Sequence, residues 1–339
     1  MQVWTLHDYQ GEPGENNKWP HVSSSFGSFD LAGISKAAAW WFRAWWLGNI
    51  SVNDAGRPPV ATMDSVFCHL VESWQNSSTG LRTLNVYTNA PFARILVNGA
   101  VASAGGPVSV DKYGTAQFTG VQFAEGHVTA EALATRDSDV ALSSDTKRSW
   151  GQAAAVVLSI DAPSVATGTG TAVYLDGSDV ALVRATIVDK NGTVVHNSSA
   201  NVTFTVSEGP ARVLGVGNGD PADRTPPHAA WKPCYHGMAR AIVRTRVKAT
   251  GDQHSRALEA LVNVEAGTGP LSSKIYTGRD IQADVATSFT VRAFAEGLKP
   301  GSLTVPLSTD ERDNVLMAAT ASVGLADVGG RINDAKTTS

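Results

Sequence analysis

The sequence predicts a mainly β protein that contains antiparallel sandwich domains. From about residue 51, short runs of alternating apolar and polar residues recur, and turns rich in Gly, Asn and Pro separate them at regular spacing. The chain is 42% hydrophobic and 17% charged, which is typical of globular proteins with packed cores. About 100 residues of such a pattern suffice for one sandwich. We therefore expect sandwiches at 51–152 and 153–265, with additional strands and a flexible tail at 266–339.

The first 50 residues have a different pattern. Residues 2–6 predict one short strand, and 11–33 a long loop rich in Gly, Ser and Pro, a length that is usually functional. Apolar side chains at helical spacing predict a helix over 34–47. One strand and one helix cannot form a domain, so the segment requires partners outside it. Four of the nine tryptophans lie in this helix, and we expect most of them to pack in a core: Trp40, Trp41, Trp45 and Trp46.

The first predicted sandwich has strand patterns at 84–89, 93–97, 117–123 and 128–133. The pair Asn98-Gly99 after the second of these is a strong hairpin signal.

In the second predicted sandwich, strand patterns lie at 155–160, 181–187, 202–206 and 241–247. Period-two alternation places one face of each in a core, which we expect for Ala181, Val183, Ala185, Ile187, Val202, Phe204 and Val206. Arg240, Arg244 and Arg246 alternate with apolar residues and are expected on a solvated face. The glycine-rich turn 215–221 is no dinucleotide site, because no helix follows it. Two further strands are expected at 289–294 and 303–307.

Charge and motif content exclude several classes of function. The net charge of −4, with no basic block, argues against a nucleic-acid partner. No apolar run of membrane-spanning length occurs, so no membrane partner is expected. Cys68 and Cys234 lie too far apart for a disulfide framework or a zinc site and are expected to be buried thiols. No cofactor and no metal site is expected.

No signal-peptide pattern follows Met1. Five glycosylation sequons nevertheless favour a secreted or lysosomal parent protein whose signal precedes Met1, so we expect the chain to be a fragment. The sequon asparagines are Asn49, Asn76, Asn191, Asn197 and Asn201.

Several motifs follow one another in the first segment: Trp4-Thr5-x-x-Asp8-Tyr9-x-Gly11-Glu12-Pro13, Trp19-Pro20, Ser24-Ser25-Phe26-Gly27, Asp30-Leu31-Ala32-Gly33 and Lys36. Their order resembles the end of the catalytic barrel in glycoside hydrolase family 2, in its β-galactosidase-like branch. The likeness continues over residues 2–265, where Val86-Tyr87-Thr88-Asn89 resembles the first accessory domain and the turn 215–221 resembles the following immunoglobulin-like one. His7 and Ser35 depart from the family pattern.

This resemblance implies that residues 1–50 are the last strand and helix of a (β/α)8 barrel, followed by immunoglobulin-like sandwiches. It also implies a retaining glycosidase for terminal β-galactosides or similar O-glycosides, which uses two glutamates about 5 Å apart. The family's acid/base lies in an Asn-Glu pair, and this pair does not occur in the chain. We therefore name no catalytic residue here, and expect the catalytic glutamates upstream, in a barrel that is the partner of this chain.

Three residues are expected to bind the carbohydrate substrate, because functional groups gather at the C-terminal ends of barrel strands. Trp4 would form the floor of a sugar subsite, and the alternative is a barrel-core tryptophan. Asp8 and Glu12 would contact the sugar, and the alternative for both is hydrogen bonds that fix the loop.

Two other functions stay open for the chain. It could be a stand-alone carbohydrate-binding module, in which Trp74, Tyr87 or Trp150 stacks on a sugar ring. It could also be a purely structural array of immunoglobulin-like domains.

Overall fold

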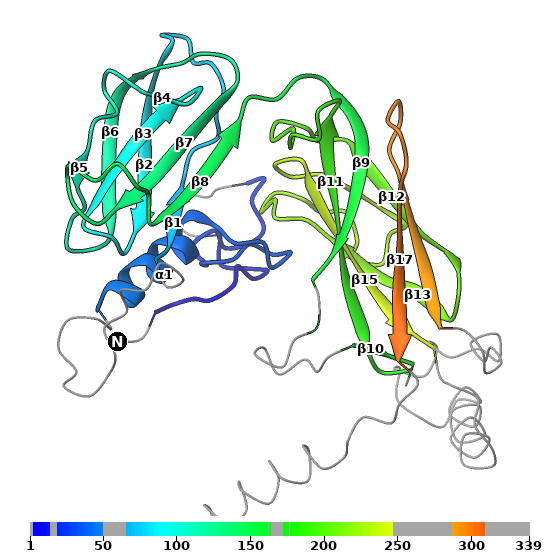
Figure 1. Ribbon diagram of the computed structural model, residues 1–339. Helices are drawn as coiled ribbons and strands as arrows, with labels where there is room; N and C mark the ends of the chain where they lie inside the picture. The colour runs from blue at the N-terminus through cyan, green and yellow to red at the C-terminus, as the bar shows by residue number, and fades with distance from the viewer. Residues whose placement is uncertain are drawn as a thin grey trace, which may run out of the picture.

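The computed structural model describes residues 3–13, 19–49, 66–161, 163, 172–175, 177–246 and 287–308. The side chain of Asn49, the predicted strand end at Val247 and the predicted tail lie outside the described residues. The described chain is mainly β and consists of two sandwiches side by side, with the first segment running beneath one towards the other (Figure 1). Its helix is too short to cross a membrane.

The first sandwich contains β1 to β8, and all its strand pairs are antiparallel. One sheet has the order β1-β2-β6, and the other β4-β3-β7-β8 with β5 beside β3. The predicted hairpin at Asn98-Gly99 is confirmed, because both residues have positive φ and join β3 to β4. The strands are β1 (Cys68–Leu70), β2 (Leu81–Thr88), β3 (Phe92–Val97), β4 (Ala100–Val101), β5 (Val108–Ser109), β6 (Thr115–Gln122), β7 (His127–Leu133) and β8 (Ser143–Arg148).

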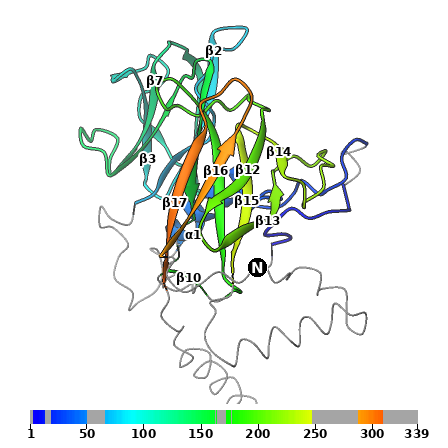
Figure 2. The same cartoon turned by 90° about the vertical axis from the view of Figure 1, so that its right-hand side faces the viewer.

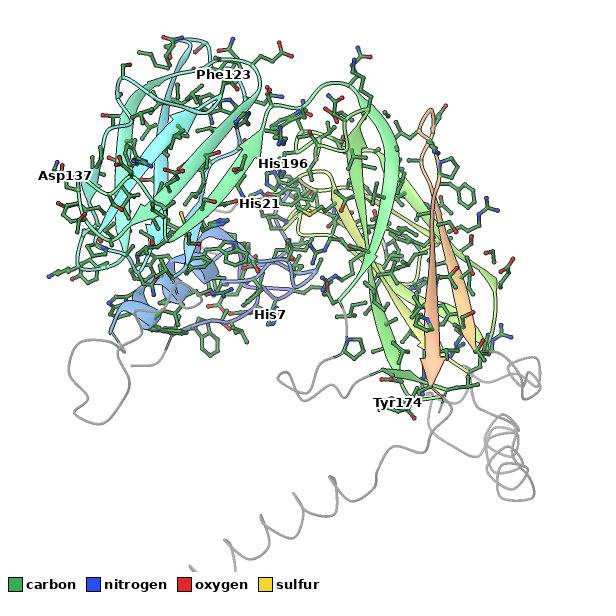
Figure 3. The ribbon with its side chains drawn as sticks, viewed as in Figure 1. His7, His21, Phe123, Asp137, Tyr174 and His196 are labelled. Carbon is green, nitrogen blue, oxygen red and sulfur yellow. The ribbon has the colours of Figure 1, made fainter. Side chains whose placement is uncertain are left out.

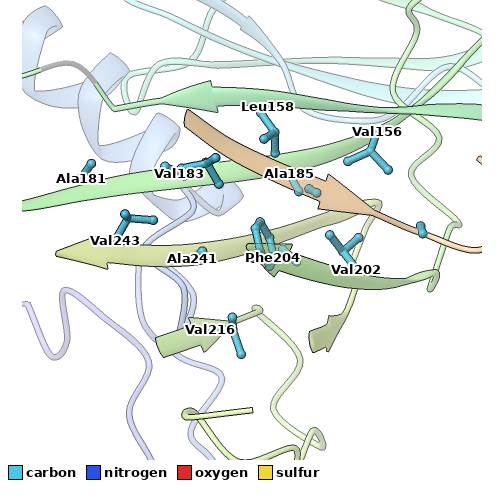
Figure 4. Packing of buried hydrophobic residues seen from close by; sticks show 14 of the residues in the cluster. Val156, Leu158, Ala181, Val183, Ala185, Val202, Phe204, Val216, Ala241 and Val243 are labelled. Carbon is cyan, nitrogen blue, oxygen red and sulfur yellow. The ribbon is translucent and has the colours of Figure 1, made fainter. Parts of the chain in front are cut away.

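The second sandwich contains β9 to β17. One sheet has the order β13-β15-β11-β9, and the other β10-β17-β16-β12-β14. The predicted inward faces of β11 and β12 are confirmed, with Ala181, Val183, Ala185, Val202 and Phe204 buried between the sheets (Figure 4). The strands are β9 (Ala153–Ile160), β10 (Val173–Tyr174), β11 (Val180–Asp189), β12 (Asn201–Glu208), β13 (Ala211–Gly217), β14 (Trp231–Pro233), β15 (Met238–Thr245), β16 (Ser288–Phe294) and β17 (Gly301–Ser308).

Two expectations for the second sandwich are corrected. Strands β16 and β17 were expected outside it, but β16 pairs with β12 from Thr203 to Glu208, so the sandwich extends beyond residue 265. Arg240 was expected on a solvated face and is only 7% exposed. It donates a hydrogen bond to Asp161 over 2.6 Å, and the first segment covers it, with Gly33 close to its guanidinium. The alternation of residues along a strand does not show that another segment of the chain covers one of its faces.

The predicted strand at 2–6 is wrong. Residues 3–6 form no ladder, and isolated bridges join His7 to Phe29 and Gln10 to Ser23 instead. The helix α1 (Ala37–Asn49) begins three residues later than expected, because Ser35 is still bridged to Phe29.

Helix α1 packs on the first sandwich through its tryptophans. The Trp40 ring stacks on His69 with centroids 4.7 Å apart, and Trp41 and Trp45 contact Tyr113. Ala44 beneath them is fully buried. Trp40, Trp41 and Trp45 therefore lie against the sandwich surface, but they are only half-buried and belong to neither core, so the expected core packing is not found. Trp46 is 52% exposed.

Candidate functional site

Asp8 ties the two halves of the first segment together. The residue is 7% exposed, and its carboxylate accepts a hydrogen bond from the Gly27 amide over 2.7 Å. The Lys36 ammonium lies 2.9 Å from the other oxygen and also donates to the Ser25 carbonyl over 2.6 Å. A side chain on Gly27 would collide with the Asp8 backbone, so the loop closes only around glycine here. These contacts are those of the loop-fixing alternative for Asp8.

Asp30 fixes the turn before helix α1 in a similar way. One carboxylate oxygen accepts hydrogen bonds from the Ala32 and Ile34 amides over 2.9 and 2.8 Å. The side chain is buried, and burial raises its pKa, although the two amides and the Arg240 charge act in the opposite direction. This carboxylate therefore holds the chain as it enters the helix.

The same segment carries a surface that we call the aromatic face, formed by the exposed Trp4, Glu12 and Phe26 and the half-buried Tyr9. Trp4 is 75% exposed, and its ring meets Tyr9 edge-on with centroids 6.3 Å apart. Tyr9 meets Phe26 in the same manner at 5.8 Å. The Tyr9 hydroxyl donates to Glu12, and this hydrogen bond raises the pKa of Tyr9. The structure thus brings Trp4 and Glu12 together through Tyr9, whose chain neighbour Asp8 is buried.

The same segment docks on the second sandwich, beside β13 and β14 (Figure 2). Its contact is the turn 218–224, which we call the Gly219 turn. The Val22 amide donates to the Pro221 carbonyl over 2.9 Å, and the Arg224 guanidinium lies 4.4 Å from the centre of the Trp19 ring. A Cβ on Gly219 would lie 2.0 Å from an oxygen of Asp30, so the Gly219 backbone lies directly against the Asp30 side chain.

The aromatic face can bind a sugar ring but offers no catalytic pair. Within the described part of the first segment, Asp8 and Asp30 are buried in protein contacts, and Glu12 is the exposed carboxylate. Flat aromatic rings stack on the apolar face of a pyranose, and a carboxylate accepts hydrogen bonds from hydroxyl groups. Among the described residues, no group of His, Cys, Asp or Glu could hold a metal ion.

The remaining predicted residues are placed as follows. Trp74 is fully buried in the core of the first sandwich, which excludes it from stacking on a sugar. Trp150 lies between β8 and β9 at the junction of the sandwiches, near the labelled His196 (Figure 3). The described sequon asparagines are exposed: Asn76, Asn191, Asn197 and Asn201.

Comparison with known proteins gives three kinds of match. Residues 165–257 match the family model of glycoside hydrolase family 2 C-terminal domain 5. The β-galactosidase BoGH2A of Bacteroides ovatus is 26% identical over 244 residues, which cover 71% of this chain and 25% of that protein. These matches confirm the resemblance to the C-terminal portion of glycoside hydrolase family 2 enzymes.

Two solved structures share the fold. A β-glycosidase from Bacteroides vulgatus is 19% identical, with a TM-score of 0.62, over 89% of this chain and 30% of that one. A β-glucuronidase from glycoside hydrolase family 2 is 22% identical, with a TM-score of 0.59, over 92% of this chain and 25% of that one. The chain thus spans about a quarter of its curated relative.

Proposed function

We propose that this chain is the C-terminal portion of a retaining glycosidase that hydrolyses terminal β-galactosides or similar O-glycosides. The observation that carries the proposal is the aromatic face. Trp4 and Glu12 are both exposed and project from one loop. Buried contacts hold this loop in place between the two sandwiches. In our proposal, residues 3–49 complete the end of a (β/α)8 barrel, where such enzymes gather their functional groups.

The catalytic glutamates are assigned to a part of the protein outside this chain. The relatives are several times longer than the region they share with it, and the chain contains no Asn-Glu pair. In this assignment, Trp4 stacks on the sugar, Glu12 accepts hydrogen bonds from its hydroxyl groups, and Asp8 positions the loop. The rest of the barrel is the partner that covers neighbouring exposed apolar residues such as Val3 and Leu6.

A neutral sugar fits the aromatic face better than an anionic one. The Glu12 carboxylate would repel the carboxylate of a glucuronide and can accept hydrogen bonds from a galactoside. The preference for a neutral sugar agrees with the relative that is named a β-galactosidase. The structural neighbour that is named a β-glucuronidase would act on an anionic sugar instead. The exposed sequon asparagines support a secreted or lysosomal location for the whole protein.

The test begins with the transcript that encodes this chain. Its upstream reading frame should encode the earlier barrel strands and an Asn-Glu pair. The longer protein should cleave an aryl β-galactoside much faster than the matching β-glucuronide, whereas the chain of 339 residues should show no turnover above buffer. Turnover by the short chain that is lost on Glu12→Gln would contradict the proposal. An upstream frame without a barrel would favour the stand-alone module.

A further inference from the structure

A groove of about 450 Å³ lies where the two sandwiches meet. Its lining includes Gln75 from the first sandwich, Trp150 and Gln152 from the connection between β8 and β9, and Asn197 and Ser198 from the second sandwich. Its volume is within the range of about 300–1,000 Å³ that is usual for small-molecule sites, and such sites often lie between domains.

Hydrogen bonds from both sandwiches hold Trp150 and Gly151 in the lining of this groove. The Gln75 amide donates to the Trp150 carbonyl over 2.8 Å. The Trp150 indole N–H donates to the Asn197 side chain over 3.2 Å, and the Gly151 amide donates to Asp189 over 2.8 Å. The indole is therefore held in place before any ligand arrives, which lowers the entropy that binding would cost.

The groove combines one aromatic side chain with uncharged polar groups. Within the described part of the chain, the Gln152 amide and the Asn197 NH₂ group make no hydrogen bond, so both can bind a ligand. No lining residue carries a formal charge. His196 meets the Trp150 ring edge-on, and burial lowers the pKa of His196, which keeps it neutral at pH 7. Such a lining suits a ligand with apolar ring faces and many hydroxyl groups.

We propose that this groove binds a neutral oligosaccharide chain. Trp150 stacks on a pyranose ring, while Gln152 and Asn197 hydrogen-bond its hydroxyl groups. The site lies on other elements than the aromatic face and goes beyond the proposed function. Neutral sugar could reach it as a free chain or as a glycan on Asn197, because Asn197-Ser198-Ser199 is a sequon at its rim. The free chain is the occupant that we propose.

The test uses the whole chain of 339 residues, made without glycans in a bacterial host. Cellohexaose, xylohexaose, mannohexaose and galactohexaose are titrated in calorimetry, with the indole N–H signals followed by NMR. At least one of them should bind and shift the Trp150 signal. Trp150→Ala should weaken binding at least about tenfold, and Gln152→Ala severalfold, because a stacked ring and its hydrogen bonds are lost.

One control separates the groove from other surfaces. Trp231→Ala removes a tryptophan that is 42% exposed elsewhere on the second sandwich, and it should leave the binding unchanged. Gln152 is exposed, so its variant keeps the fold even if Trp150→Ala does not.

Three results would overturn the proposal. Binding of none of the four sugars would do so, as would binding that Gln152→Ala leaves unchanged or that Trp231→Ala removes. Protein from a glycosylating host tests the other source of sugar. The groove would belong to the chain's own glycan if a glycan on Asn197 shifts the Trp150 signal and no free sugar binds to the unglycosylated protein.

Discussion

Gly219→Ala should loosen the first segment from the second sandwich. The new Cβ would lie 2.0 Å from an Asp30 oxygen, where ordinary contacts begin at 3.4 Å. Asp30 cannot easily turn aside, since its other oxygen holds two backbone amides, and each such bond to a charged group contributes about 1.5–3 kcal/mol. Moving the Gly219 turn instead costs about 1–3 kcal/mol for the poorer packing, and it also breaks the hydrogen bond between Val22 and Pro221. The turn should therefore move, at a cost of about 2–3 kcal/mol.

Amide hydrogen exchange distinguishes a movement of the Gly219 turn from a movement of Asp30. The Val22 amide should exchange about 50-fold faster in the variant, because 1.4 kcal/mol corresponds to a tenfold change. The Ala32 and Ile34 amides should keep their protection. Gly217→Ala is the matched control, because a Cβ there meets nothing within 4 Å. Unchanged exchange at Val22, or lost protection at Ala32 and Ile34, would refute this account of the docking.

Three further perturbations follow from buried groups. Asp8→Asn should cost about 2 kcal/mol, because Lys36 stays partly covered without its counter-charge; an unchanged urea midpoint would contradict this. Burial would raise the pKa of Asp145, but its histidine and lysine neighbours hold it at about 2. This stabilisation is present above pH 4 and is lost as the pH falls towards 2. Asp145→Asn should therefore lower the free energy of unfolding by about 2 kcal/mol at pH 7 and by little near pH 2. An equal loss at both pH values would disprove this account of Asp145. Burial raises the pKa of Cys68 and Cys234 to about 12, so both should react with a thiol reagent at pH 8 only after unfolding; rapid labelling of the native protein would show otherwise.

Much of the second sandwich could be predicted from local patterns. The alternation around Val183 and Phe204 predicts the inward faces correctly, because a strand's period of two is a local property. The place of β16 could not be predicted in this way, because its partner β12 lies more than 80 residues earlier in the chain. Pairing over such a distance depends on the assembled sandwich.

The candidate site, too, could be predicted from the sequence only in part. Family resemblance singled out Trp4 and Glu12, which the structure brings to one exposed surface. It related the turn 215–221, which contains Gly219, to an immunoglobulin-like domain and not to the site, and it did not mention Arg224, because both come from a part of the chain some 200 residues later. The density of glycine in that turn was a signal of close backbone approach. Arg240 was misplaced because the segment that covers it belongs to another part of the chain.

The kinetics of Trp4→Phe test the central claim most directly. The longer protein and its variant would be compared on an aryl β-galactoside. Trp46→Phe is the control, because Trp46 is also exposed, at 52%, and does not belong to the aromatic face. If Trp4 forms the floor of a sugar subsite, kcat/KM should fall about tenfold or more while the melting temperature barely moves. A fall in stability of about 1 kcal/mol or more, with unchanged kinetics per folded molecule, would contradict the claim.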